Sequence, residues 1–260
     1  MTARRISQRD KAGAPFISFL SFVFLLSLVC GAGNARAETP AGCDRAISAP
    51  ARDTTQPPNL GQIKYQLLRY RCTQYDVDIA KVIGKAHRWI EQRAEHVKKP
   101  ALVIDVDETA LTNWAVMYHN DFAYVADGDC DLKSRRACGQ DAWEHSAAAP
   151  AIGPTLTLFE FAKTKHVAVF FITGRHEGGD RRAVTETNLH RAGYNDWTQL
   201  YLRPEDSREP SPSIFKTRAR EDIEKQGYRI IANIGDQQSD LAGGHAERGF
   251  KLPNPFYYIP

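Results

Sequence analysis

Residues Ala101 to Trp114 read ALVIDVDETALTNW, an apolar run of about six residues that leads directly into a group of acids. The length and the Val and Ile content of this run are typical of a buried strand. Carboxylates do not belong in a core unless they are paired or bind a cation. We therefore expect the strand to hold Asp105, Asp107 and Glu108 rigidly at a position where acids have chemical work to do.

The chain after Pro100 alternates short apolar runs with helical patterns. Strict alternation of this kind is typical of an α/β protein with a parallel sheet that helices cover on both faces. Gly193 and Gly227 follow helical stretches, where a left-handed C-cap favours glycine. The expected strands are 101–106, 167–172, 199–203 and 229–234, and the expected helices between them are 155–165, 181–193 and 213–227.

In an open parallel sheet, ligands bind outside the carboxyl ends of the strands. The residues that follow three of the expected strands, and one residue near the start of a helix, are therefore predicted to converge on one edge. They are Asp105 and Asp107, Thr173 with Gly174 and Arg175, Gly235 with Asp236 and Asp240, and Lys216.

Several carboxylates at one edge repel one another unless a cation lies among them. A ligand set of oxygens without Cys or His selects a hard ion such as Mg²⁺, which in turn binds phosphate oxygens. Asp105 could then attack phosphorus while Asp107 protonates the leaving oxygen. A hydroxyl from Thr173 and an ammonium from Lys216 would stabilise the transferring phosphoryl group.

These motifs resemble those of the haloacid dehalogenase (HAD) superfamily of phosphohydrolases. The match covers roughly residues 60 to 260 and is closer to subfamily IIIB, the acid phosphatases that include bacterial secreted enzymes and plant vegetative storage proteins. Its specificity lies in the order and spacing of several stretches rather than in one motif. These stretches are DVDETALTN, FITGR, TNLHRAGY, YLRP, FKTRAR, IGDQQSDL and the closing FKLPNPFYYIP.

The resemblance implies a HAD-like core with Asp105 as nucleophile and Asp107 as general acid and base. It also implies a Mg²⁺ site made by Asp105, the Asp107 backbone carbonyl and Asp236, with Asp240 in support. Thr173 and Lys216 are the implied phosphoryl-binding residues. Arg175 could bind substrate or serve only to pair with the acids.

The first 37 residues have the pattern of a secretory signal peptide. Basic residues precede an apolar stretch of about 15 residues, and Ala35-Arg36-Ala37 fits a cleavage site. A spanning helix needs about 20 apolar residues. Lipid attachment at Cys30 is disfavoured because Val29 is not the small residue that such a signal requires. We expect cleavage after Ala37 and a periplasmic or secreted protein that is not attached to a membrane.

Removal of the leader takes five basic residues from 34 and one acid from 31, leaving 29 basic and 30 acidic residues. A net charge near −1 argues against a binder of nucleic-acid polymers, which uses a concentrated basic face. Four cysteines remain, an even number that suits an oxidising compartment. Three pairings are open, and we favour Cys130 with Cys138 and Cys43 with Cys72 over a zinc site.

Residues 38–98 are expected to form an irregular arm followed by helices that cap or flank the core of residues 99–260. The insertion 115–150 would overhang the active edge as part of a small helical cap. Trp114, Tyr118 and Trp143 could stack on an aromatic leaving group or could be ordinary packing residues. The closing stretch is expected to pack against the core, and nothing in it requires chemistry.

The leading hypothesis is a Mg²⁺-dependent acid phosphatase that hydrolyses small phosphomonoesters, nucleoside monophosphates among the candidates. A storage or binding protein on the same scaffold is the alternative, disfavoured because Asp105 is intact. A signalling receiver domain also gathers acids, a threonine and a lysine, but it has no need of Asp107. The sequence leaves the substrate, the pH optimum and the oligomeric state open, and a homo-oligomer is allowed.

Overall fold

The computed structural model describes residues 39–43, 58–209 and 211–259. The predicted leader, with Cys30 and the cleavage point after Ala37, lies outside these ranges. Within them, no helix combines the length and the apolar character that crossing a membrane requires.

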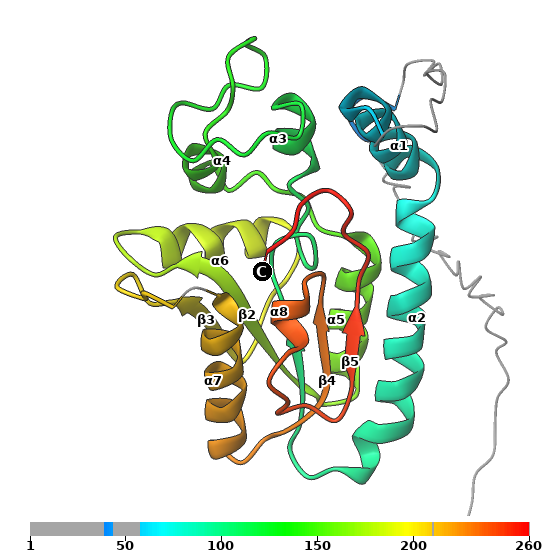
Figure 1. Ribbon diagram of the computed structural model, residues 1–260. Coiled ribbons are helices and arrows are strands. Elements are labelled where there is room, and N and C mark those ends of the chain that lie inside the picture. The colour runs from blue at the N-terminus through cyan, green and yellow to red at the C-terminus, as the bar shows by residue number, and fades with distance from the viewer. Residues whose placement is uncertain (1–38, 44–57, 210, 260) are drawn as a thin grey trace, which may run out of the picture. The chain divides into compact units, whose positions relative to one another are not determined.

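One sheet of five parallel strands forms the centre of the described chain, in the order β3-β2-β1-β4-β5 (Figure 1). The four expected strands are all present, which confirms the α/β class. The fifth, at the edge, has only three residues and is too short to give a sequence pattern. The strands are β1 Pro100–Ile104, β2 Ala168–His176, β3 Gln199–Arg203, β4 Arg229–Gly235 and β5 Gly249–Lys251.

Helices cover both faces of this sheet (Figure 1). Helices α5 (Gly153–Thr164) and α6 (Arg181–Arg191) lie on one face, together with the long N-terminal helix α2 (Tyr75–Arg93). Helix α7 (Pro212–Lys225) lies on the other face. The three connecting helices match the predicted ranges to within two residues at each end. The Ser211 hydroxyl caps α7 by accepting the Ser213 N–H.

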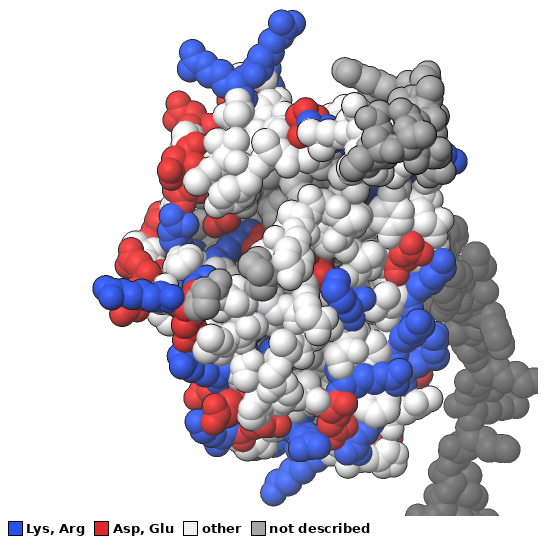
Figure 2. All heavy atoms as spheres, viewed as in Figure 1, with Lys and Arg blue, Asp and Glu red and all other residues white. Residues whose placement is uncertain are grey.

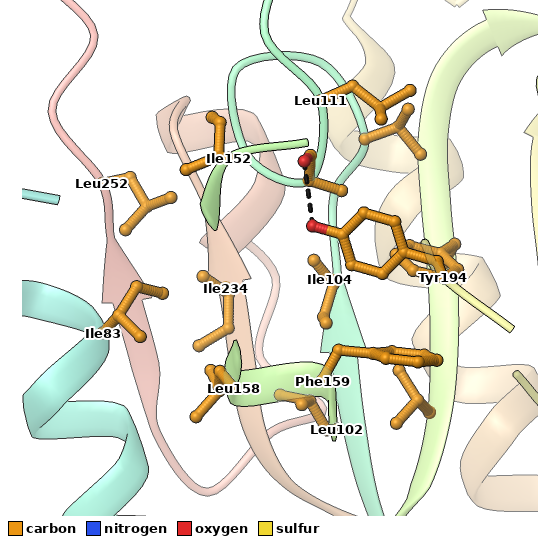
Figure 3. Close-up of a cluster of buried hydrophobic side chains, with 14 of the residues drawn as sticks. Ile83, Leu102, Ile104, Leu111, Ile152, Leu158, Phe159, Tyr194, Ile234 and Leu252 are labelled. Carbon is orange, nitrogen blue, oxygen red and sulfur yellow. Dashed lines mark hydrogen bonds between the residues drawn. The ribbon is translucent and has the colours of Figure 1, made fainter. Parts of the chain in front are cut away.

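The apolar run of β1 is continuous because its residues alternate between two cores. Leu102 and Ile104 face α5 and contribute to the larger core (Figure 3). In the same core, the Tyr194 hydroxyl donates to the Ala110 carbonyl at 2.9 Å. Ala101 and Val103 belong to the smaller core against α7. A strand buried on both faces needs apolar residues at every position.

The order of the strands locates the ligand-binding edge. From β1 the chain moves outward to β2 and β3, and then returns to place β4 on the other side of β1. The direction of winding therefore reverses between β1 and β4, and a crevice opens outside the carboxyl ends of strands at such a switch point.

The N-terminal helices divide between two positions. Helix α2 packs on the sheet through Ile79, Ile83 and Ile90, so it flanks the core. Helix α1 (Leu60–Thr73) reaches the insertion instead, where the Lys64 ammonium pairs with Asp121 at 2.5 Å. A 3₁₀ turn at Ala94–His96 leads from α2 into β1.

The insertion 115–150 carries two short helices, α3 (Trp114–His119) and α4 (Gln140–Ser146), on the side of the strand ends (Figure 1). Ion pairs from α4 to the start of α6 hold it against the core, among them Asp141 with Arg181. The cysteines pair as the sequence analysis prefers, Cys130 with Cys138 in the insertion and Cys43 with Cys72 at α1.

Candidate active site

The ends of β1 and β4 bring acids from distant parts of the chain together. Asp105 follows β1, and its N–H donates to the Ile234 carbonyl of β4 at 3.0 Å. Asp236 follows β4, and Asp240 lies in the short helix α8 (Gln238–Leu241). A Cβ at Gly235 would lie 2.3 Å from the Asp240 Cβ, so only glycine allows this close turn.

Three carboxylates and one lysine share a buried space. Asp105, Asp236 and Asp240 are buried, and each offers an oxygen within 4.8 Å of the others. Lys216 of α7 is only 5% exposed, and its ammonium donates to Asp105 Oδ1 and Asp240 Oδ1, each at 2.5 Å. One ammonium cannot balance three carboxylates, so a cation or protons must offset the remaining charge.

The pKa values of these groups reflect the same imbalance. Burial raises the pKa of Asp236 to about 6, and the charge of Asp240 adds to the rise. Burial and the charge of Asp240 also raise the pKa of Asp105 well above its usual value, although Lys216 acts against them. Burial lowers the pKa of Lys216, but Asp105 and Asp240 outweigh it and raise that pKa. Buried carboxylate oxygens with excess negative charge fit a hard divalent cation.

Asp107 is held by an arginine from the next strand. The Arg175 guanidinium donates to both oxygens of Asp107, at 2.6 Å and 3.0 Å, and the Asn113 side-chain amide donates at 2.9 Å. Burial raises the pKa of Asp107, but the charge and hydrogen bonds of Arg175 outweigh burial and the pKa is lowered. The sequence left two roles open for Arg175, substrate binding and pairing with an acid. In the structure Arg175 pairs with Asp107.

Glu108 is a buried acid that lines the same cavity as the other carboxylates. It accepts hydrogen bonds from the Asn113 backbone N–H at 2.5 Å, the Asn113 side chain at 3.1 Å and the Tyr257 hydroxyl at 2.9 Å. Its φ of +53° lies in the left-handed region, which costs a residue with a side chain about 1–3 kcal/mol. These three hydrogen bonds stabilise the strained turn that carries Asp107.

Thr173 lies at the predicted strand end but is fully buried. Its hydroxyl accepts the Arg175 backbone N–H at 3.1 Å. The neighbouring Gly174 and Arg175 line the cavity above the acids, and Thr173 does not. In this structure Thr173 therefore shapes the end of β2, where the pairing with β3 shifts register between Thr173 and His176.

A cavity of about 770 Å³ opens above the acids, between the strand ends and the insertion. Figure 2 shows its mouth as a recess below the surface of the insertion. Asp105, Asp107, Asp236, Asp240 and Lys216 line its floor. Its aromatic lining comes from the insertion and from the C-terminal segment, namely Phe122, Tyr124, Phe256, Tyr257 and Tyr258.

The three aromatic residues predicted as stacking candidates do not line this cavity. Trp114 is 3% exposed, and its indole N–H donates to the Ala41 carbonyl at 3.0 Å. Tyr118 stacks on Trp114, and the Trp143 indole donates to Asn113 at 2.7 Å. Each of the three has its ring or its N–H engaged within the fold, which favours packing, one of the two roles expected for them.

Five residues that contact the acids had no role predicted from the sequence, and one of them is Thr109, whose hydroxyl donates to Asp236 at 3.1 Å. Asn113 lies in the quoted stretch DVDETALTN and Gln237 lies in IGDQQSDL, but neither was given a role. Asn254 donates to Asp236 at 2.7 Å, and Tyr257 donates to Glu108. The only available signal for Asn254 and Tyr257 was their place in the closing stretch FKLPNPFYYIP.

The site combines two carboxylates for covalent and proton-transfer chemistry, a group of oxygens for a cation, and a buried ammonium for anionic oxygens. This set is suited to phosphoryl transfer, in which catalysis is mostly positioning and charge stabilisation.

Comparisons with known proteins agree with this geometry. Residues 50–260 match the model of HAD superfamily, subfamily IIIB (acid phosphatase). The chain is 36% identical to the stem 28 kDa glycoprotein of Glycine max over 72% of this chain and 70% of that protein. It is 39% identical to acid phosphatase 1 of Solanum lycopersicum over 60% of this chain and 58% of that protein.

Vegetative storage protein 1 of Arabidopsis thaliana is 30% identical over 61% of this chain and 55% of its own length. The class C acid phosphatase from Bacillus anthracis shares the fold, with a TM-score of 0.57 and 20% identity over 75% of this chain and 86% of that one. The family match covers the sheet, the strand ends and the C-terminal segment alike. The chain therefore belongs to the acid phosphatases of HAD subfamily IIIB.

Proposed function

We propose that the chain is a secreted, Mg²⁺-dependent acid phosphatase that hydrolyses small phosphomonoesters through an aspartyl-phosphate. The observation that carries this proposal is the placement of Asp105. Its carboxylate lies at the end of β1, on the floor of the cavity and in contact with the Lys216 ammonium, with Asp107 two residues further along. Family membership supports the same reaction class.

In the first step, an Asp105 oxygen attacks phosphorus and the bond from phosphorus to the leaving oxygen breaks. Asp107 donates its proton to that oxygen, and the alcohol departs. In the second step, Asp107 takes a proton from water, whose oxygen attacks the aspartyl-phosphate and releases inorganic phosphate and free Asp105. Since Arg175 holds the pKa of Asp107 low, the protonated donor is favoured at acidic pH.

Asp105, Asp236, Asp240 and the Asp107 backbone carbonyl are the groups that would hold Mg²⁺. Mg²⁺ supplies charge neutralisation for the phosphoryl oxygens and for the crowded acids. Lys216 binds the same phosphoryl oxygens from the opposite element, α7. Thr173 acts by fixing the end of β2, since its hydroxyl accepts the Arg175 backbone N–H.

The insertion 115–150 would act as a cap that selects the leaving group. It overhangs the cavity and supplies Phe122 and Tyr124 to the lining, so apolar or aromatic leaving groups, including nucleosides, are the expected preference. On the face drawn in Figure 2, basic and acidic side chains of the described residues are interspersed, which does not favour a nucleic-acid polymer.

Secretion is supported by the leader pattern and by two disulfides, which form and persist in oxidising compartments. N-terminal sequencing of the exported protein should begin at Glu38. A start upstream of this residue would contradict cleavage after Ala37.

The proposal is tested by phosphate release from p-nitrophenyl phosphate and a panel of nucleotides, with Mg²⁺ or with chelator. We expect Mg²⁺-dependent turnover by the mature chain that Asp105→Asn abolishes. The matched control is Asp206→Asn, the same substitution at an exposed acid outside the cavity, which should keep full activity.

A second candidate function is storage or binding on the same fold, favoured by relatives named vegetative storage proteins. A wild-type chain that folds and binds Mg²⁺ but releases no phosphate from any member of the panel would support storage and contradict the enzymatic proposal.

A further inference from the structure

The closing stretch of the chain lies against the acids of the site. The Leu252 N–H donates to the Gly235 carbonyl at 2.8 Å, so the pairing with β4 continues one residue past the end of β5. Phe256 then packs against Tyr75 and Trp114, with ring centroids 5.2 Å and 5.1 Å away. The polar side chains between and beside these anchors are directed at Asp236 and Glu108.

Asn254 is fixed at both ends of its amide. Its nitrogen donates to Asp236 Oδ2 at 2.7 Å, and its oxygen accepts the Phe256 N–H at 2.9 Å. Because a backbone N–H can only donate, the amide oxygen must face Phe256 and the NH₂ group must face Asp236. Asn254 is thus a dedicated donor to this carboxylate.

The two oxygens of Asp236 are treated differently. Oδ2 accepts from Asn254 and from the Gln237 side chain at 2.6 Å, which occupies both of its lone-pair directions. Oδ1 accepts only from the Thr109 hydroxyl at 3.1 Å, within the described chain. One lone pair therefore remains on Oδ1, available for a cation.

Tyr257 forms a separate anchor of the same segment. Its hydroxyl donates to Glu108 at 2.9 Å and does not bond to Asp236. The segment is therefore attached to the β4 acid by Asn254 and to the turn after β1 by Tyr257, two contacts that substitution can separate.

We propose that Asn254 is a positioning residue of the metal site, which holds Asp236 so that Oδ1 faces the cation. The C-terminal segment is then part of the metal site and not only of the core. This inference rests on the proposed function, since it concerns Mg²⁺ at the same acids. Hydrogen-bond partners of ligating carboxylates commonly change metal affinity by 10–100-fold when removed.

The test is calorimetric titration of Mg²⁺ into metal-free protein, with no substrate present. Asn254→Ser keeps a short acceptor for the Phe256 N–H but cannot reach Asp236. We expect its Mg²⁺ affinity to fall by about 10–100-fold. If the serine variant fails to fold, Asn254→Thr offers the same acceptor on a stiffer side chain.

Phe256→Leu is the matched control, because it weakens an anchor of the same segment, the ring contacts to Tyr75 and Trp114, and changes no polar group beside the acids. Its Mg²⁺ affinity should stay within about threefold of the wild type, well inside the 10–100-fold change expected at position 254. An equal loss in both variants would show general loosening of the segment and would overturn the positioning role.

The result also separates the two proposals. A wild type that binds Mg²⁺ and an Asn254→Ser variant that binds it equally well would overturn the role of Asn254 and leave the phosphatase proposal standing. A wild type that binds no Mg²⁺ would overturn both.

Discussion

Replacing Lys216 by methionine removes the ammonium that lies among the buried acids while keeping a side chain of similar length. In the wild type, this ammonium donates to Asp105 and Asp240, each at 2.5 Å, and both partners are buried. The variant leaves these two carboxylates and Asp236 with no cation. Removing one partner of a buried ion pair typically costs about 3–5 kcal/mol.

We expect this loss in chelator at pH 7.5, measured as the change in the free energy of unfolding in urea. For a chain of this size, about 1 kcal/mol corresponds to 2–4 °C, so the Tm should fall by about 6–20 °C. Mg²⁺ should restore much of the loss because it replaces the missing positive charge. At a concentration of 100 times its Kd, a ligand stabilises the folded state by about 2.7 kcal/mol.

The pH dependence follows from the raised pKa values. Asp236 has a pKa of about 6 in the folded chain against 3.8 ordinarily, and the pKa of Asp105 is also raised. At low pH such acids are protonated and do not lower the free energy of unfolding. As pH rises through the pKa of the folded state, they ionise and the free energy of unfolding falls. Lys216 lowers both pKa values, so its removal raises them further and makes ionisation of the two acids more unfavourable. The loss of stability caused by Lys216→Met should therefore be smaller at pH 5 than at pH 7.5.

The control is Lys225→Met on the same helix, α7. Lys225 has a 68% exposed side chain and pairs with Glu221 one turn away, so its removal should cost less than about 1 kcal/mol. A Lys216→Met variant whose Tm in chelator matches the wild type, or whose loss is equal at pH 5 and pH 7.5, would refute the charge balance described here.

Two further predictions concern the acids on either side of this lysine. Asp236→Asn removes a group whose raised pKa makes the metal-free wild type lose about 2 kcal/mol between pH 4 and pH 7, so urea unfolding should show a shallower pH dependence in the variant. Parallel curves would contradict the raised pKa. Arg175→Met removes the partner of Asp107, so kcat/KM should fall by about 10–100-fold and the basic limb of its pH profile should move to higher pH, since the pKa of Asp107 rises. A lower rate with an unshifted profile would mean that Arg175 does not set this pKa.

Much of the fold could be predicted because its signals are local. The apolar run of β1, the amphipathic pattern of α7 and the glycines at 193 and 227 each reflect the conformation of a few neighbouring residues. The strand β5 could not be predicted, since three residues paired at a sheet edge have no periodicity of their own. The place of α2 on the sheet also needed the structure, because Ile79, Ile83 and Ile90 recur at helical spacing and predict an apolar helix face but not the element that this face contacts.

The sequence by itself determined the α/β class, the family and the residues that end each strand, because apolar runs and the order and spacing of motifs can be seen along the chain without its fold. Only the tertiary structure decided which groups touch. Lys216 meets Asp105 across 111 residues, and Tyr257 meets Glu108 across 149. An indole or an amide suits either a packed or a functional position. Contacts between distant segments decide which of the two positions such a side chain occupies. In this protein they place Trp114 in the core and the closing stretch beside the acids of the site.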